Sequence, residues 1–248
     1  MPTTESRAFS HVGRRDNNED AFYVSDALGL FVVADGMGGY EGGEVASDLA
    51  ISTIREFFEH RQRDSDETWP FGFDDSVGLL ANMLTTAVRM ANSRVVEAKR
   101  GVLGKMGSTV VSIAVGNDEL AIAHVGDSRV YRFRDGTLKR MTRDHSLSEE
   151  MGVEGPDGEI TPDTTMRNVL TRALGMPDVS ADVRVEKPLP GDMFLLCSDG
   201  LLESLSDADI AARLQATPSV DACEGLVEAA YEAGGRDNIT VALVRIGD

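Results

Sequence analysis

The sequence predicts an α+β protein in which mostly antiparallel β-sheets are covered by helices. Three observations support this class. Strand-like segments outnumber segments with helical periodicity, dipeptides with hairpin-turn chemistry separate consecutive strands, and no internal repeat or low-complexity linker interrupts the 248 residues. The turn dipeptides are Asn117-Asp118 and Asp135-Gly136. The absence of a linker favours one domain over residues 1–248.

Short runs of apolar or alternating residues predict the strands. They cover Ala8–Val12, Ala21–Val24, Leu30–Ala34, Ser108–Val115, Leu120–Val125, Val130–Phe133, Asp182–Val185, Met193–Leu196 and Ile239–Val244. Apolar residues at helical spacing predict helices over Val45–Phe58, Ser76–Lys99, Asp207–Leu214 and Val220–Ala233. In the second of these helices the apolar stripe comprises Val77, Leu80, Leu84, Val88, Ala91 and Val95.

Two stretches show little periodicity of either kind. His60–Asp75 is polar and irregular, and we expect a surface connection there. Arg143–Arg167 is acidic and contains Gly-Pro-Asp-Gly. We interpret this second stretch as an excursion from the sheet, a loop or flap that carries a short helix.

Charge and cysteine content narrow the function classes. The formal net charge is −18 and no run of Lys and Arg offsets it, so we expect no nucleic-acid partner. No stretch approaches a membrane span and the N-terminus lacks the apolar core of a signal peptide, so we expect a cytoplasmic protein. Cys197 and Cys223 are the only cysteines and form no Cys-x-x-Cys pair. Cys197 lies in an apolar run, which favours a buried free thiol over a disulfide or zinc ligand.

The chain is organised around residues Leu30–Gly43, which read LFVVADGMGGYEGG. The apolar run is typical of a strand buried on both faces, and it stops at Asp35. A sheet would hold the backbone of Asp35 while its carboxylate stays accessible. Gly36 would allow a close approach of the main chain, so that its carbonyl can act as a ligand. An isolated Asp-Gly is more often a tight turn between strand and helix, but this one is not isolated.

Acidic residues recur at the ends of predicted strands. Asp35 follows FVVA, Asp127 follows IAHVG, Asp199 follows FLLCS, Asp237 precedes NITVALV, and Glu19-Asp20 adds a fifth position. Carboxylates at one edge of a sheet repel one another unless cations lie between them, and oxygen ligands suit Mg²⁺ or Mn²⁺ rather than zinc. Two ions about 3.5–4 Å apart can lower the pKa of a bridging water and aim it at an electrophile. Each aspartate alone is more often a turn residue or helix cap, and spacing leaves both interpretations open.

Several motifs occur in a fixed order: GRRDNNED, VVADGMGGYEGGEVAS, MGSTVV, AHVGDSRVYRF, TRDHS, NVLTRALG, LLCSDGLLE and GRDNITV. Over about residues 8–246 they resemble the metal-dependent protein phosphatases, the type 2C serine/threonine phosphatases, in their compact bacterial form. The resemblance implies two antiparallel sheets packed face to face with helix pairs outside, a four-layer αββα sandwich. It also implies a flap at about residues 143–170.

The resemblance also implies roles by position. Asp35 would bridge two ions, with the Gly36 carbonyl, Asp199 and Asp237 as the remaining direct ligands. Glu19 and Asp20 match a pair that acts largely through metal-bound waters, and Asp127, with Asp199, matches the ligands of a third, weaker ion. Arg15 matches the arginine that grips the substrate phosphate, a task suited to a guanidinium that donates two parallel bonds. Asn238 is expected to order the surroundings of Asp237.

The implied activity is hydrolysis of phosphoserine and phosphothreonine in proteins, with Mg²⁺ or Mn²⁺ as cofactor. A metal-bridging hydroxide would attack phosphorus in line while the ions and Arg15 offset charge on the equatorial oxygens. The implied partners are phosphorylated proteins and a cognate kinase, and we expect a monomer without a membrane partner. Two alternatives remain: a phosphatase dedicated to a partner-switch regulator or a small phosphoester, and a non-catalytic phosphoprotein-binding module. The intact Asp35, Asp199, Asp237 and Arg15 argue against the second.

Three positions depart from the family pattern. Gly13 lies two residues before Arg15, where many bacterial members leave one residue more, and Thr165-Met166 replaces a histidine-proline of the flap. Met37 stands where animal members often have a histidine, although methionine is common in bacterial members. Methionine has no proton for the leaving group, and His145 is the only serious histidine candidate, although its Asp-His-Ser turn favours a structural hydrogen bond. We therefore hypothesise that a metal-bound water protonates the leaving group.

Overall fold

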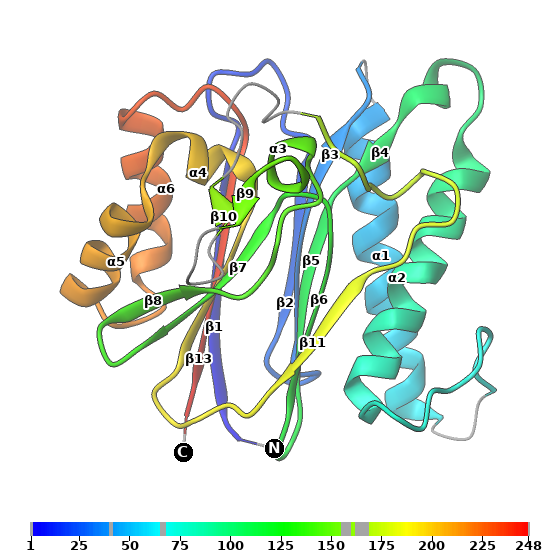
Figure 1. Cartoon of the computed structure of the whole chain (residues 1–248), viewed down its shortest axis with the longest axis horizontal. Helices are drawn as coiled ribbons and strands as arrows, with labels where there is room; N and C mark the ends of the chain where they lie inside the picture. Colours follow the sequence, from blue (N-terminus) through cyan, green and yellow to red (C-terminus); the bar gives the residue numbers. More distant parts are fainter. Residues whose placement is uncertain (1, 40–41, 65–67, 155–159, 162–168, 248) are drawn as a thin grey trace.

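The computed structural model describes residues 2–39, 42–64, 68–154, 160–161 and 169–247. Two antiparallel sheets lie face to face at the centre of the molecule, and helices cover the outer face of each (Figure 1). The predicted α+β class is therefore confirmed, as is the four-layer sandwich that the resemblance implied.

One sheet contains the first and last strands of the chain, in the order β1-β13-β12-β7-β8. Its strands are β1 Thr4–His11, β7 Arg129–Arg134, β8 Thr137–Arg140, β12 Met193–Cys197 and β13 Ile239–Ile246. The other sheet has the order β11-β6-β5-β3-β2, with β4 paired to the end of β3. Its strands are β2 Asp20–Ser25, β3 Leu30–Met37, β4 Gly107–Ser108, β5 Val110–Val115, β6 Leu120–Val125 and β11 Asp182–Glu186.

Helices flank both sheets (Figure 1). Helices α1 (Gly42–Arg63) and α2 (Leu79–Ala98) cover the sheet that contains β3, and a 3₁₀ turn at Gly101–Lys105 follows them. On the opposite side lie α4 (Asp199–Ser204), α5 (Asp207–Ala216) and α6 (Ala222–Glu232). The predicted flap contains the short helix α3 (Leu147–Glu150) and the paired strands β9 (Val153–Glu154) and β10 (Ile160–Thr161).

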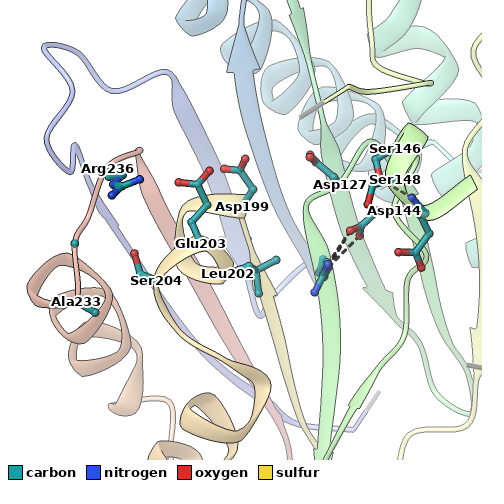
Figure 2. Close-up of a pocket in the computed structure, with 13 residues that line it drawn as sticks. Asp127, Asp144, Ser146, Ser148, Asp199, Leu202, Glu203, Ser204, Ala233 and Arg236 are labelled. Carbon is teal, nitrogen blue, oxygen red and sulfur yellow. Dashed lines mark hydrogen bonds and ion pairs between the residues drawn. The ribbon is translucent and has the colours of Figure 1, made fainter. Parts of the chain in front are cut away.

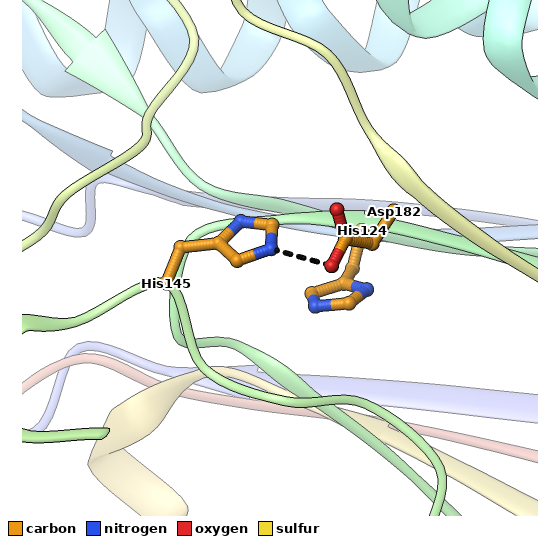
Figure 3. Close-up of side chains that lie close together, drawn as sticks. All are labelled: His124, His145 and Asp182. Atoms are coloured by element: carbon orange, nitrogen blue, oxygen red, sulfur yellow. Dashed lines mark ion pairs between the residues drawn. The ribbon is translucent and has the colours of Figure 1, made fainter. Parts of the chain in front are cut away.

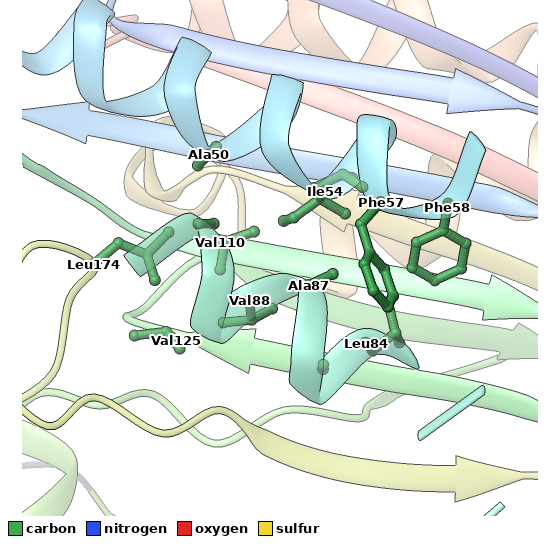
Figure 4. Close-up of a cluster of buried hydrophobic side chains, with 14 of the residues drawn as sticks. Ala50, Ile54, Phe57, Phe58, Leu84, Ala87, Val88, Val110, Val125 and Leu174 are labelled. Atoms are coloured by element: carbon green, nitrogen blue, oxygen red, sulfur yellow. The ribbon is translucent and has the colours of Figure 1, made fainter. Parts of the chain in front are cut away.

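The core is divided into layers because successive side chains of a strand point to opposite faces. In β3, Leu30 and Val32 pack against α1 and α2, whereas Phe31 and Val33 pack between the two sheets. Figure 4 shows the first of these layers, with Ile54 of α1 above the sheet. All residues from Leu30 to Ala34 are fully buried, which confirms the predicted strand with two buried faces.

Several predicted boundaries were wrong. β3 does not stop at Ala34 but continues to Met37, because the backbone of Asp35 hydrogen-bonds to Thr109, which lies between β4 and β5. Helix α1 continues to Arg63, so the first residues of the predicted surface connection are helical. The basic residues of its last turn, among them Arg61, favour this extension through the helix dipole.

Two further boundaries differ at local turns. The predicted strand Ser108–Val115 is interrupted at Thr109. Helix α2 begins at Leu79 rather than Ser76, because Asp74 accepts hydrogen bonds from the backbone and hydroxyl of Ser76 and closes a separate turn. Val77 consequently lies outside the helix and is 41% exposed, whereas the rest of the predicted stripe faces the helix packing.

Sequence periodicity missed short elements. α4 spans six residues, too few to show a helical period, and β8 is a partly exposed edge strand with the sequence TLKR. The turn before β8 was predicted from Asp135-Gly136, where both residues have positive φ, as a type I′ hairpin requires.

Both cysteines are free and buried, as predicted for Cys197. Within the described residues, none of the helices has the length and apolarity to cross a membrane.

Candidate active site

Asp20 and Asp35 lie directly opposite each other on the paired strands β2 and β3. The backbone N–H of Asp35 donates to Thr109 Oγ1 at 3.2 Å, and its carbonyl accepts from the Thr109 N–H at 2.8 Å. These bonds leave the Asp35 carboxylate free while the sheet fixes its backbone. Directly opposed residues project to the same face of a sheet, so the two acidic side chains share one environment.

Asp20 also connects the two sheets. Its Oδ2 accepts hydrogen bonds from Ser198 Oγ at 2.8 Å and from Thr240 Oγ1 at 2.7 Å, and both donors belong to the opposite sheet or its edge. Its Oδ1 is buried and has no hydrogen-bond partner among the described residues. Burial raises the pKa of Asp20 to about 6, and the charges of Asp237 and Glu19 add to the increase. A buried oxygen without a partner is costly unless a cation satisfies it, so this atom fits a metal site.

A second acidic group forms where α4 approaches the start of β13. Carboxylate oxygens of Asp199, Glu203 and Asp237 all lie within 4.8 Å of one another. Sequence reasoning missed Glu203. The sequence feature that could have identified Glu203 is its position four residues after Asp199, which places both side chains on one face of a helix. In Figure 2 these two side chains lie beside each other on one wall of a cavity.

The predicted carboxylates converge at one end of the sandwich. Burial raises the pKa of Asp35 well above its ordinary value, and the charges of Asp20, Asp199, Asp127 and Asp237 raise it further. The pKa of Asp199 is raised in the same way, by burial first and then by Asp127 and Asp237. For Asp127, burial raises the pKa to about 6. A partly buried cluster of carboxylates repels itself unless cations lie within it, and its oxygen donors fit hard ions such as Mg²⁺ or Mn²⁺.

The start of α1 packs against the predicted Gly36 and Glu19 ligands. The Gly36 N–H and the Ser47 hydroxyl both donate to the Glu19 carbonyl, at 3.1 and 2.7 Å. A Cβ at Gly36 would lie 2.1 Å from the Gly43 carbonyl oxygen, and a Cβ at Gly43 would lie 2.5 Å from Glu19 Cδ. Only glycine permits this close approach of helix, strand and loop.

Asn238 orders the loop before Glu19. Its Oδ1 accepts from the Glu19 N–H at 2.8 Å, and its Nδ2 donates to the carbonyls of Val12 at 2.8 Å and Asn17 at 2.9 Å. These bonds hold the loop from Val12 to Glu19 beside the start of β13, next to Asp237.

Arg15, rather than its neighbour Arg14, points to the acidic cluster. Arg15 Nη2 lies 2.6 Å from Asp237 Oδ2, and its Nε donates to the Arg236 carbonyl at 3.3 Å. Arg14 turns away, with its guanidinium over the ring of Tyr231 and its Nε bonded to the Gly234 carbonyl. The Arg15 side chain remains 55% exposed, so it can reach a ligand in solvent.

A cavity of about 600 Å³ adjoins the cluster. Asp199 and Glu203 lie on one side and Asp127 lies across from them (Figure 2). The wall at the root of the flap contains Arg129 and Asp144, whose side chains form charge-assisted hydrogen bonds of 3.0, 3.2 and 2.8 Å. The remaining lining residues are Ser146, Ser148, Glu149, Leu202, Ser204, Ala233, Gly234 and Arg236.

The four histidines of the chain are the candidate proton donors: three contact nearby backbone groups, and His60 lies at the end of α1 away from the site. His11 Nδ1 accepts from the Gly13 N–H at 2.9 Å, and His124 Nε2 lies 2.7 Å from the Arg143 carbonyl oxygen. His145 Nδ1 accepts from the Gly126 N–H at 3.1 Å. His60 lies in the last turn of α1. The departure at Thr165-Met166 lies outside the described residues.

Comparison with known proteins agrees with this geometry. A family model described as protein phosphatase 2C matches residues 7–234. The serine/threonine protein phosphatase PstP of Mycobacterium tuberculosis is 36% identical over 241 residues, which cover 94% of this chain and 43% of PstP. The serine/threonine phosphatase stp of Listeria welshimeri is 32% identical, with 93% of this chain and 90% of stp covered. The chain thus spans less than half the length of PstP.

Solved structures share the fold. The crystal structure of the PstP catalytic domain in complex with two manganese ions has a TM-score of 0.83 and 34% identity, and the match covers 100% of both chains. The phosphatase MsPP of Mycobacterium smegmatis, crystallised with cacodylate, has a TM-score of 0.79, 32% identity and 98% coverage of both chains. Because the family model matches most of the sequence and the relatives share its whole fold, this chain belongs to the protein phosphatase 2C family.

Proposed function

We propose that the protein is a Mg²⁺- or Mn²⁺-dependent serine/threonine phosphatase that hydrolyses phosphoserine and phosphothreonine in proteins. The observation that carries this proposal is the partly buried carboxylate cluster, with the unsatisfied Oδ1 of Asp20, beside an open cavity and an exposed arginine. A cluster of this charge would be unfavourable without cations, and the cavity gives a phosphorylated side chain access to it.

In this proposal the carboxylates of Asp35, Asp199 and Asp237 and the Gly36 carbonyl hold two ions, and Glu19 and Asp20 act through water. Asp127, with Asp199, holds a third and weaker ion. Bound ions of this kind lower the pKa of water and offset negative charge on phosphoryl oxygens. The shared environment of Asp20 and Asp35, and the effect of Asp127 and Asp237 on the Asp199 pKa, support this assignment.

Arg15 orients the phosphate in the proposed reaction. Its guanidinium can donate two parallel hydrogen bonds to phosphoryl oxygens, which fixes the phosphorus relative to the carboxylate cluster. The exposure of the side chain and its position next to Asp237 support this role. Met37 has no proton to donate, and both ring nitrogens of His145 face protein groups, so neither side chain supplies the leaving-group proton.

The same site suggests which partners the protein has, and whether it acts as a monomer with one domain. We propose that phosphorylated proteins are the substrates and that a cognate kinase opposes the enzyme, in the cytoplasm, where kinases obtain ATP. Every proposed site residue comes from one chain, which supports a monomer. We also propose one domain over residues 1–248 with a flap at about 143–170. A core layer shared by Phe31 of one sheet and Phe194 of the other supports the single domain.

Phosphate release from synthetic phosphopeptides tests the proposal. The purified chain with Mn²⁺ should release phosphate from phosphoserine and phosphothreonine peptides, lose the activity in EDTA and regain it when Mn²⁺ is restored. A phosphotyrosine peptide of the same sequence is the matched control. If the protein binds phosphopeptides but releases no phosphate, it is a phosphoprotein-binding module rather than an enzyme.

A further inference from the structure

Three side chains meet at the root of the flap, away from the proposed metal pair: His124, His145 and Asp182 (Figure 3). One ligand-type atom from each lies within 4.8 Å of the others, and the two imidazole rings stack with centroids 4.6 Å apart. Both histidines are nearly fully buried. The arrangement resembles a metal site in composition, but its hydrogen bonds assign it a different role.

One ring nitrogen of each histidine makes a hydrogen bond, and this bond defines the tautomer of the ring. His124 Nε2 lies 2.7 Å from the Arg143 carbonyl oxygen and must therefore carry a proton. His145 Nδ1 accepts the Gly126 N–H, so the proton of the neutral ring is on Nε2. Arg172 Nη1 lies 2.6 Å from the Asp182 carboxylate and neutralises it. His145 therefore has a proton rather than a lone pair on the nitrogen nearest Asp182, which does not suit a metal ligand.

His145 is instead joined twice to Gly126. The ring accepts from the Gly126 N–H at 3.1 Å, and the backbone N–H of His145 donates to the Gly126 carbonyl at 2.9 Å. Gly126 has a φ of 102° and lies so close to Thr109 that an added Cβ would be 2.6 Å from Thr109 Cγ2. The ring bond therefore holds the peptide that precedes Gly126, and the backbone bond holds the peptide that leads into Asp127, so together they fix the backbone at Gly126.

The Gly126 bond fixes the tautomer of His145, and the charge of Asp182 favours the same tautomer. The Nε2 of His145 lies 3.2 Å from Asp182 Oδ2, an electrostatic contact without hydrogen-bond geometry, while the lone pair on Nδ1 faces Gly126. Burial and the neighbouring ring of His124 lower the pKa of His145, which keeps the ring neutral. The lone pair that accepts from Gly126 is thus available across the physiological range.

We propose that His145 is a positioning residue that holds the Gly126 peptide so that the Asp127 carboxylate faces Asp199 and can share an ion with it. This inference rests on the proposed function, in which Asp127 holds the third ion. After burial, the charge of the partly buried Asp127 is the next largest cause of the raised Asp199 pKa, and both residues line one cavity. A change at Gly126 therefore alters the distance between the two carboxylates that would share the ion.

Mn²⁺ titration of the metal-free protein by calorimetry tests this role, and Asp127→Ala identifies the weak binding event. His145→Ala should weaken that event by about tenfold or more, as loss of a group that orients a ligand does, and leave the tighter events unchanged. His145→Asn should restore binding to within about twofold of wild type, because its amide oxygen can occupy the place of Nδ1. If the Ala variant does not fold, His145→Gln, whose amide oxygen lies nearer the place of Nε2, serves as the loss variant.

Asn92→Ala is the matched control. Asn92 Oδ1 also accepts a glycine N–H, that of Gly175, at 2.7 Å, but it lies outside the site. This variant should bind the weak ion as wild type does. The proposal is overturned if wild type shows no weak event, if His145→Ala retains it, if His145→Asn fails to restore it, or if Asn92→Ala weakens it equally. Retained phosphopeptide hydrolysis in any of these cases would leave the proposed function intact.

Discussion

Arg15 Nη2 and Asp237 Oδ2 are 2.6 Å apart, so the proposed phosphate-binding arginine is paired with a proposed metal ligand. The same carboxylate oxygen cannot be fully shared between a guanidinium and a divalent ion. Since the arginine is 55% exposed, it can leave Asp237 for a phosphate when an ion takes its place. Metal binding and substrate binding are therefore expected to respond oppositely to changes at Arg15.

Arg15→Ala should weaken phosphate binding while metal binding tightens. Loss of one charge-assisted contact of about 1.5–3 kcal/mol should lower kcat/KM roughly ten- to hundredfold, mainly through KM, for both a phosphopeptide and an aryl phosphate. Removal of the positive charge should tighten Mn²⁺ binding by up to about fivefold, since an exposed ion pair is worth up to about 1 kcal/mol. Kinetics and calorimetry on one preparation check both effects. An unchanged kcat/KM for both substrates would show that Arg15 does not bind the substrate phosphate.

Asp127→Ala should reduce turnover by weakening a low-affinity ion and leave the tighter pair of ions bound. Asp127 lies across the cavity from Asp199 and Glu203, so its loss should affect one ion more than the others (Figure 2). Calorimetric Mn²⁺ titration separates the events. Equal weakening of every event would instead place Asp127 in the principal pair.

The metal-free protein should become more stable as pH falls from about 7.5 to about 5.5. The folded-state pKa values of Asp20 and Asp127 are raised to about 6, and those of Asp35 and Asp199 are also raised. A raised pKa means that the folded state binds the proton more tightly, so stability is present below the unfolded pKa and is lost as pH rises through the folded pKa. Thermal unfolding in EDTA at several pH values checks this trend.

Two controls sharpen the pH prediction. Asp199→Asn should make stability less dependent on pH, because one carboxyl with a raised pKa is replaced by an amide that does not titrate. Saturating Mn²⁺ should reverse it, because the ions bind the deprotonated carboxylates. Because the lowered pKa values of His124 and His145 affect both proteins alike, equal pH trends in metal-free wild type and Asp199→Asn would show that the cluster is not repulsive.

The leaving-group proton should not come from His145. Its Nδ1 accepts from Gly126 and its Nε2 faces Asp182, so the ring has no nitrogen directed at a substrate. Rates for a series of aryl phosphates should fall steeply as leaving-group pKa rises, with the same slope in wild type and His145→Gln. Met37→His should help poor leaving groups selectively if the new imidazole reaches the cavity. A shallow wild-type slope that steepens sharply in His145→Gln would identify His145 as the general acid.

Local sequence patterns predicted much of the fold. Strands with both faces buried, such as Leu30–Ala34, and the amphipathic helices were recognisable because their periodicity reflects burial. α4 was not recognisable, because six residues contain too little pattern. The extension of β3 through Asp35 depends on hydrogen bonds to Thr109, which lies 74 residues away in the sequence.

The site was predictable in composition but not in geometry. Carboxylates at strand ends suggested a metal centre, whereas their convergence depends on the register that places Asp20 opposite Asp35. Glu203 approaches Asp237 only because α4 packs beside the start of β13, and the link between His145 and Gly126 joins two loops. Contacts of this kind arise from packing between distant segments, so a single sequence does not contain them as a local signal.

The most direct test of the account is phosphopeptide turnover by Asp35→Asn in saturating Mn²⁺, with Mn²⁺ binding and thermal stability measured on the same protein. Asp35 is held by the sheet and surrounded by the charges of Asp20, Asp199, Asp127 and Asp237, so the amide should remove charge and metal affinity while the packing stays intact. We expect a loss of turnover of about 10²-fold or more, weakened binding of the tight ions, and metal-free stability that holds or rises. Near wild-type turnover of this variant with Mn²⁺ would show that Asp35 does not hold the ions on which turnover depends.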